Sequence, residues 1–134
     1  SISLGADGVQ VGSRFAVCKE SSAHEEFKNF VLDSKEGDTV LTLKELTAVR
    51  LLKNDFYKKV IEAYQANATI QELKDLLGKG RAKKGIFEGN LVEGELEIGQ
   101  VSSMLNKTEA AHEIVIDIMN SFYKTQKKIS ELSL

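Results

Sequence analysis

Apolar and polar residues alternate along the chain with two periods, one typical of strands and the other typical of helices. The stretch GVQVG at residues 8–12 has its two valines on one face, which predicts a short strand, and FAVC at 15–18 continues it inward. The stretches DTVLTL at 38–43 and AVRLL at 48–52 predict two more short β segments. The expected β content is therefore small and lies in the first half of the chain.

Helical periods account for most of the other residues, and capping patterns mark where several helices begin. Ser22 with Glu25 and Thr69 with Glu72 have the spacing of a capping box. The Gly- and Lys-rich residues 79–95 are expected to form a loop with about one turn of helix. The expected helices cover residues 22–33, a segment capped by Asn54 or Asp55, a segment from Thr69 to Gly78, residues 95–105 and residues 108–130.

The last helix has the clearest pattern, because its apolar residues recur with a 3.6-residue period. Acidic residues lie at its start and lysines at its end, which suits the helix dipole. The stripe is expected to be a packing face, and its aliphatic area could also support a homodimer. It consists of Ala111, Ile114, Val115, Ile118, Met119 and Phe122.

Composition narrows the class of protein without identifying its chemistry. The 134 residues, 42% apolar and 28% charged, suit one globular domain. A net charge of −2 gives no electrostatic reason to expect nucleic acid or an anionic membrane as partner, and no apolar run approaches the ~20 residues of a membrane span. The single cysteine, Cys18, suits a cytoplasmic protein without disulfides and is expected to be a small buried residue. His24 and His112 lie far apart, so no metal site is expected.

The early strand is the unusual feature, because it ends in a Gly12-Ser13 turn of the type that approaches phosphate groups. A single strand needs neighbours for its backbone hydrogen bonds. Only 38–43 and 48–52 are available as partners, and both are weak. We therefore expect the chain to be the last part of a larger domain.

Six stretches in order resemble one known family over residues 1 to about 120. They are LGADGVQVGSRF, KESSAH, FK, DTVLT, VRLLKN and EGNLVEGELEIGQVSSML. Together they resemble the FMN-dependent nitronate monooxygenase and enoyl-acyl-carrier-protein reductase II family. KESSAH and the final helix are more similar to the reductase branch.

The resemblance implies an α/β fold, the C-terminal fragment of a TIM (β/α)8 barrel followed by a mainly helical subdomain. Residues 1–36 would be the end of the barrel, with strand eight, its phosphate-binding turn and the following helix, and residues 37–134 would be the helical subdomain. TIM barrels often hold phosphate after strands seven and eight. The resemblance therefore assigns FMN binding to Gln10, Val11, Gly12 and Ser13.

The same resemblance places the catalytic residues outside this chain. The family's catalytic histidine, the other side of the phosphate site and the NAD(P)H site would belong to the missing N-terminal half of the barrel, and neither His24 nor His112 matches the catalytic position. The chain alone is therefore expected to be inactive. The whole protein would be an enoyl-acyl-carrier-protein reductase using NAD(P)H or, alternatively, a nitronate monooxygenase oxidising nitroalkanes with oxygen. A non-catalytic helical interaction module is the alternative of another class.

Several polar residues have both a functional and a structural interpretation. Arg50 and Asn54 could hold the helical part near the flavin, although a fold-stabilising polar pair is the favoured interpretation. Gln100 could reach the active site from its helix. The basic residues of the loop could meet an acidic acyl-carrier protein, but a solvated loop is the simpler expectation. These basic residues are Lys79, Arg81, Lys83 and Lys84.

Overall fold

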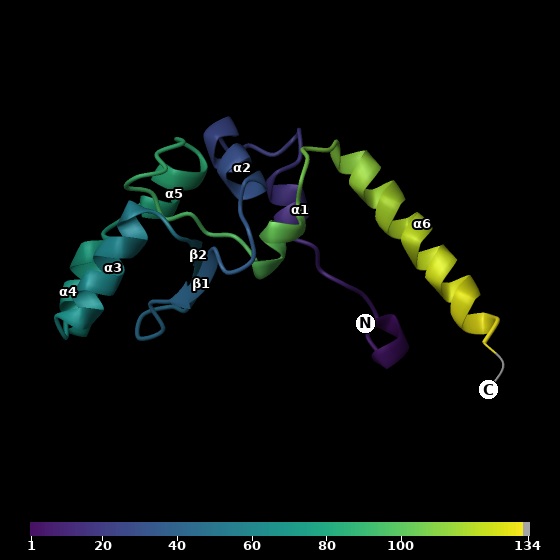
Figure 1. Ribbon diagram of the computed structural model, residues 1–134, viewed down its shortest axis with the longest axis horizontal. Coiled ribbons are helices and arrows are strands. Elements are labelled where there is room, and N and C mark those ends of the chain that lie inside the picture. Colours follow the sequence, from purple (N-terminus) through teal and green to yellow (C-terminus); the bar gives the residue numbers. More distant parts are fainter. Residues whose placement is uncertain (133–134) are drawn as a thin grey trace.

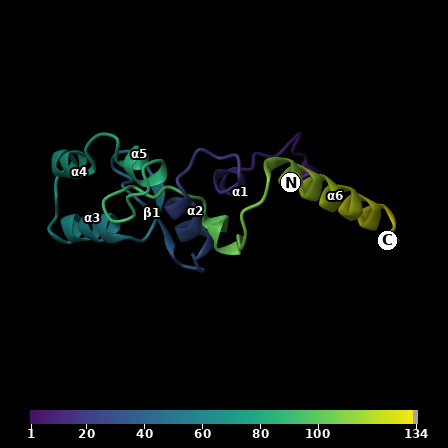
Figure 2. The same cartoon turned by 90° about the horizontal axis from the view of Figure 1, so that it is seen from above.

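The computed structural model describes residues 1–132, and it shows an elongated arrangement of short elements (Figure 1). Helices α3, α4 and α5 gather at one end, α1 and α2 lie near a two-stranded hairpin in the middle, and α6 extends away at the other end (Figure 2). In chain order the elements are η1 (Ile2–Leu4), α1 (Ser13–Ala16), α2 (Glu25–Leu32), β1 (Thr39–Thr42), β2 (Val49–Leu52), α3 (Asp55–Gln65), α4 (Ile70–Leu77), α5 (Arg81–Ile86), η2 (Gln100–Met104) and α6 (Ala111–Ser130). Within residues 1–132, no helix combines the length and the apolar content that a membrane crossing demands.

The hairpin confirms both of the β segments expected between residues 38 and 52. Strands β1 and β2 are antiparallel, with Leu41 opposite Arg50. A third segment runs along the other edge of β2: the N–H of Leu52 donates to the carbonyl of Leu96 at 2.9 Å, and the N–H of Ile98 donates to the carbonyl of Arg50 at 3.2 Å. The helix expected over 95–105 is therefore wrong in its first half. Backbone groups there are engaged with β2, and only the short 3-10 helix η2 follows.

Strand β2 separates two hydrophobic cores, because its successive side chains point to opposite faces. Leu51 belongs to a core with side chains of α3 and α4, and Leu52 belongs to a core with side chains of α2 and the segment 96–98. The first core contains Leu43, Leu51, Phe56, Val60 and Leu73, and the second contains Val17, Ala23, Phe27, Val31, Leu52, Leu96 and Ile98. The second core draws residues from both sides of position 36, and the domain boundary expected there stays a prediction.

Two of the three expected caps are present. Asn54 begins α3 and accepts a hydrogen bond from the N–H of Tyr57 at 2.9 Å, and Thr69 begins α4 in a complete capping box. The third is wrong, since α2 begins at Glu25 and its cap is His24. The Nδ1 atom of His24 accepts from the N–H of Glu26 at 3.2 Å, so the helix starts later than the Ser22 pattern predicts.

The strand expected at residues 8–12 is not formed, and residues 13–16 are helix α1 instead of a continuation of the strand. No described segment supplies ladder hydrogen bonds to residues 8–12. An isolated extended segment cannot satisfy its backbone groups within a sheet, so the local alternation of valines is not enough to make a strand.

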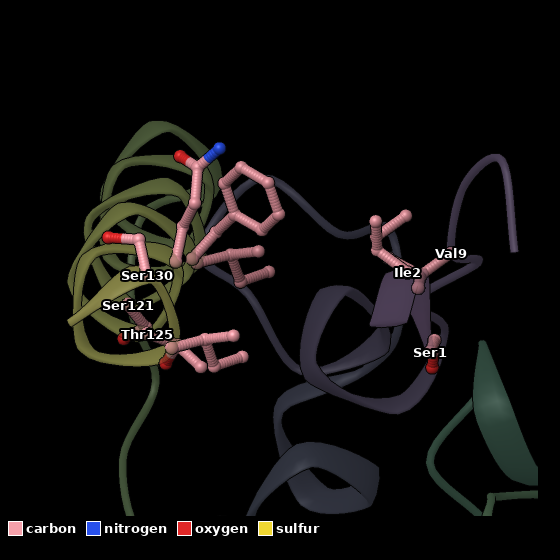
Figure 3. A pocket seen from close by; sticks show the side chains of 10 residues that line it. Ser1, Ile2, Val9, Ser121, Thr125 and Ser130 are labelled. Carbon is pink, nitrogen blue, oxygen red and sulfur yellow. The ribbon is translucent and has the colours of Figure 1, made fainter. Parts of the chain in front are cut away.

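Helix α6 confirms the expected last helix but buries little of its apolar stripe. Ile114 is fully buried, whereas Val115 is 50% exposed and Phe122 is 38% exposed. An apolar groove of about 580 Å³ lies between α6 and the N-terminal segment. Figure 3 shows Ile2 and Val9 facing α6 across this groove. Most of the stripe is therefore open in this chain.

Candidate functional site

A single open cavity of about 850 Å³ brings together the four residues expected to bind a phosphate group. Four separate parts of the chain form its wall: the segment before and within α1, the start of β2, the segment leading into η2, and one position of α6. The lining residues are Gln10, Val11, Gly12, Ser13, Arg14, Ala16, Ala48, Val49, Arg50, Glu97, Ile98, Gly99, Val101, Leu105 and Ile118. The expected residues therefore share one site although the expected strand is not formed.

The hydroxyl of Ser13 holds the turn against the segment that leads into η2. Ser13 is buried, and its Oγ accepts a hydrogen bond from the N–H of Gly99 at 3.1 Å. A Cβ on Gly99 would lie 2.5 Å from that Oγ, so only glycine permits this approach. The family resemblance assigns this hydroxyl to a phosphate as a donor; in the structure its oxygen accepts from the protein backbone, and its O–H has no acceptor among the described residues.

Arg14 ties the same turn to α6 through two carboxylates. Its Nε and Nη2 donate to Oε2 of Glu109 at 3.0 and 2.8 Å, and its Nη1 donates to Oδ2 of Asp117 at 2.7 Å. Hydrogen bonding to Asp117 and Glu109 raises the pKa of Arg14 above its usual value. Hydrogen bonds from Lys107 and Arg14 lower the pKa of Glu109. All three guanidinium nitrogens of Arg14 thus donate to carboxylates, and they join α1 to α6 and to the segment just before it.

Arg50 also lines the cavity, and its hydrogen bonds are longer than those of Arg14. Its Nη1 donates to Oγ1 of Thr39 at 3.2 Å and approaches the Thr39 carbonyl at 3.5 Å. Within residues 1–132 it forms no ion pair, and Glu97, the carboxylate on the same cavity wall, forms none either. Arg50 and Asn54 do not form the polar pair that the sequence suggested, because Asn54 has different partners.

Asn54 instead fixes the loop that leads to the cavity. Its Nδ2 donates to the carbonyls of Leu91 and Gly94 at 2.7 and 2.8 Å. Gly94 packs directly on the backbone of Gly85 in α5, where a Cβ on Gly94 would overlap Gly85. No motif or turn pattern in the sequence predicts this contact between two glycines. The glycine clusters at 78–89 and 94–99 are the sequence feature that coincides with it.

Glu95 is a buried residue two positions before Glu97, the first residue of its segment that lines the cavity. Burial, with a smaller contribution from the charge of Glu97, raises the pKa of Glu95 to about 7, and Arg81 acts in the opposite direction. Burial favours the uncharged form of a carboxyl group. Glu95 therefore changes its charge within the neutral pH range, close to the segment that forms the site.

The other residues weighed from sequence lie away from the cavity. His112 is exposed at the start of α6, His24 caps α2, and Cys18 is buried with 5% of its surface exposed. Gln100 is exposed and lines a neighbouring hollow instead. In the described part of the chain no group of three or more His, Cys, Asp or Glu residues is arranged to hold a metal ion.

The basic loop is only partly free in solution. Lys79, Lys83 and Lys84 are exposed. Arg81 is structural, since it donates to the carbonyls of Leu76 and Leu77 at the end of α4 and to the carbonyl of Glu93 in the loop after α5. Its guanidinium also lies 4.4 Å above the ring of Phe56.

Comparison with known proteins finds a family model and relatives that carry the same description. A family model described as nitronate monooxygenase matches residues 1–121. A probable nitronate monooxygenase of Bacillus subtilis (strain 168) is 50% identical over 101 residues, which are 75% of this chain and 29% of that protein. A probable nitronate monooxygenase of Staphylococcus aureus (strain MSSA476) is 31% identical over 122 residues, which are 90% of this chain and 34% of that protein. The chain thus spans about a third of the length of these curated relatives.

A solved structure gives the same result in three dimensions. FabK from Thermotoga maritima superposes with a TM-score of 0.85 and 28% sequence identity, covering 96% of this chain and 41% of that one. The family resemblance drawn from the sequence is therefore confirmed, and the chain has an α/β structure like part of that protein. Since the family model covers residues 1–121 of the 134, the chain belongs to the nitronate monooxygenase family.

Proposed function

We propose that this chain supplies one wall of an FMN site in an FMN-dependent oxidoreductase, with the remainder of a TIM barrel supplied by preceding sequence. One observation carries the proposal: the four residues that the family resemblance assigns to FMN line a single cavity, together with a cationic side chain, Arg50. The cavity of about 850 Å³ is within the size range of cofactor pockets. Membership in the nitronate monooxygenase family supports the same class of enzyme.

The residues of the cavity wall fit a phosphate group. Among the described residues, the backbone N–H groups of Gln10, Val11 and Gly12 donate to no protein acceptor, and a Cβ on Gly12 would meet no atom within 4 Å. Backbone N–H groups and an unhindered glycine allow close approach of an anion. FMN, when bound, would supply the redox chemistry, and the residues of this chain would hold and orient its phosphate end.

We further propose that the substrate is an enoyl thioester of acyl-carrier protein and that NAD(P)H is the reductant. The structural match to FabK supports this branch, because it extends over 96% of the chain. Oxidation of nitroalkanes with oxygen is the second candidate. The names of the curated relatives favour it, and the Bacillus subtilis protein is 50% identical. Acyl-carrier protein as partner, a cytoplasmic location and a homodimer stay predictions.

The test compares two glycines in the complete protein that contains this segment. Gly8 and Gly12 both have room for a side chain and neither has a positive φ, but only Gly12 lines the cavity. We expect Gly12→Val to weaken FMN binding at least ~10-fold, whereas the matched control Gly8→Val leaves it unchanged. Equal FMN affinity in both variants would contradict the site.

Substrate assays then separate the branches. NAD(P)H consumption that depends on an enoyl thioester would support the reductase, and oxygen consumption that depends on a nitroalkane would support the monooxygenase. A complete protein that binds no flavin and consumes neither substrate would contradict both, and would favour the helical interaction module.

A further inference from the structure

We propose that Arg50 is a receptor for a phosphate-ester group held in the 850 Å³ cavity, a role that rests on the nucleotide site proposed above. The shared chemistry is a phosphate carrying one or two negative charges. Its source is either the phosphate of the flavin nucleotide or a phosphate of the second substrate. The argument depends on how the two arginines of the cavity wall are engaged.

The two arginines differ in charge compensation. Arg14 donates three hydrogen bonds to the carboxylates of Glu109 and Asp117, so two negative charges face its one positive charge. Arg50 faces no carboxylate at ion-pairing distance within the described residues, and its protein partner is the uncharged Thr39. Arg50 therefore contributes an uncompensated positive charge to the cavity wall.

The geometry of Arg50 also leaves donors available. Both contacts with Thr39 involve Nη1, so Nε and Nη2 have no acceptor among the described residues. The side chain is half-buried, and Thr39 limits its motion from the neighbouring strand. A planar guanidinium with two free donors on adjacent nitrogens matches two oxygens of a phosphate group.

Ser13 keeps its hydroxyl donor available, because its Oγ accepts the N–H of Gly99 and an accepting hydroxyl still carries its own O–H. The O–H of Ser13 and the backbone N–H groups of residues 10–12 are therefore neutral donors for an anion. Charge compensation in the cavity then depends on a cationic side chain. Arg50 is the one cation on the described cavity wall without a carboxylate partner.

Glu97 provides an internal check on this reasoning. Its carboxylate lines the same cavity and has no cationic partner within residues 1–132. A negative charge there opposes the binding of an anion. Removing the charges of Arg50 and Glu97 should therefore change phosphate affinity in opposite directions, which a purely structural role of either residue would not produce.

The first experiment uses inorganic phosphate as probe and measures its dissociation constant by calorimetry on the complete protein without flavin. We expect Arg50→Gln to weaken phosphate binding about 10- to 100-fold and Arg50→Lys to weaken it less, because the charge remains while the fork is lost. Glu97→Gln should tighten binding about two- to fivefold. Lys44→Gln removes an exposed charge from the β1–β2 turn, outside the cavity, and should change affinity less than about twofold.

Equal phosphate affinity in wild type, Arg50→Gln and Lys44→Gln would overturn the inference. Because this probe needs no flavin, that result is distinguishable from failure of the FMN proposal. The FMN proposal fails if the wild-type protein binds no flavin. Circular dichroism of each variant confirms that the fold is retained. If Arg50→Gln unfolds the protein, the Glu97→Gln and Arg50→Lys variants decide, and unchanged phosphate affinity in both would refute the role.

A second measurement identifies the source of the phosphate. Riboflavin lacks the phosphate of FMN. A flavin-phosphate role therefore predicts that Arg50→Gln lowers the affinity for FMN toward that for riboflavin and leaves the affinity for riboflavin unchanged. A substrate-phosphate role predicts unchanged FMN affinity and a KM for NADPH or for the pantetheine thioester raised about 10-fold or more at similar kcat. If neither FMN affinity nor KM changes, Arg50 is not a phosphate receptor.

Discussion

Replacement of Gly99 by alanine tests the contact that holds the turn at residues 12–13 against the segment leading into η2. The backbone of Gly99, with φ −71° and ψ 157°, is one that alanine adopts without strain. The obstacle is steric: the new Cβ would lie 2.5 Å from Oγ of Ser13, while its next neighbours are at 3.9 Å. A single oxygen atom therefore decides the cost of the substitution.

The loss of stability in Gly99→Ala depends on how Oγ of Ser13 moves to make room for the new methyl group. The hydroxyl has to rotate away from the new methyl group, so the hydrogen bond from the N–H of Gly99 is lost in a partly buried setting. Losing the bond and leaving the N–H unpaired costs about 1–3 kcal/mol. Alanine regains about 0.5 kcal/mol by restricting the unfolded chain. We expect Gly99→Ala to lower the free energy of unfolding by about 1.5 kcal/mol.

The double-mutant cycle with Ser13→Ala gives the decisive result. Ser13→Ala alone should cost about 1–2 kcal/mol, because the N–H of Gly99 loses its acceptor. In that background the obstructing oxygen is gone, so Gly99→Ala should be neutral or stabilising by about 0.5 kcal/mol. Urea unfolding gives the free energy of unfolding of all four proteins. Circular dichroism is the probe, because the chain has no tryptophan to report unfolding by fluorescence. If Gly99→Ala costs the same with and without the hydroxyl, the reasoning is refuted.

Three further predictions concern the supports of the site. Gly94→Ala places a Cβ on Gly85 and should lower the free energy of unfolding by about 3 kcal/mol, whereas Gly8→Ala, in open space, should not; equal urea midpoints would contradict the packing. Arg14→Gln should cost about 1–2 kcal/mol and Lys107→Gln, an exposed partner of Glu109, less than about 0.5 kcal/mol, again from urea curves. The folded-state pKa of Glu95 is raised to about 7 from 4.5, so the folded protein retains a proton that the unfolded chain releases. Stability should therefore fall between pH 4.5 and 7 by up to about 3 kcal/mol, and Glu95→Gln should flatten this part of the profile; an unchanged slope would exclude Glu95 as its source.

Local sequence patterns predicted the parts of the fold that local interactions determine. The hairpin and the caps at Asn54 and Thr69 depend on residues close in sequence, and the structure confirms them. The residues Phe56 and Val60 are fully buried, as their helical spacing predicts. The four candidate residues at 10–13 also line one cavity, because consecutive residues stay together whatever their secondary structure.

Patterns failed where a distant segment determines the outcome. The alternation at residues 8–12 predicts a strand, but a strand also requires a paired neighbour, and no described segment provides one. Residues 95–98 looked helical, yet their backbone is held by β2. The bond between Ser13 and Gly99 joins residues 86 positions apart, and no local pattern contains it. Sequence reasoning therefore named candidate residues that line one cavity, without revealing what each one contacts.

Strand β2 connects these observations, since three consecutive side chains meet three different environments. Leu51 and Leu52 are anchored in the two hydrophobic cores, on opposite faces of the strand, and Arg50 precedes them at the cavity wall. Fully burying a leucine contributes about 1.5–3 kcal/mol, so both anchors resist displacement of the strand. The backbone of Arg50 is also held by the N–H of Ile98. A guanidinium on such a fixed strand is pre-positioned for an anion, because binding requires little further ordering of the backbone.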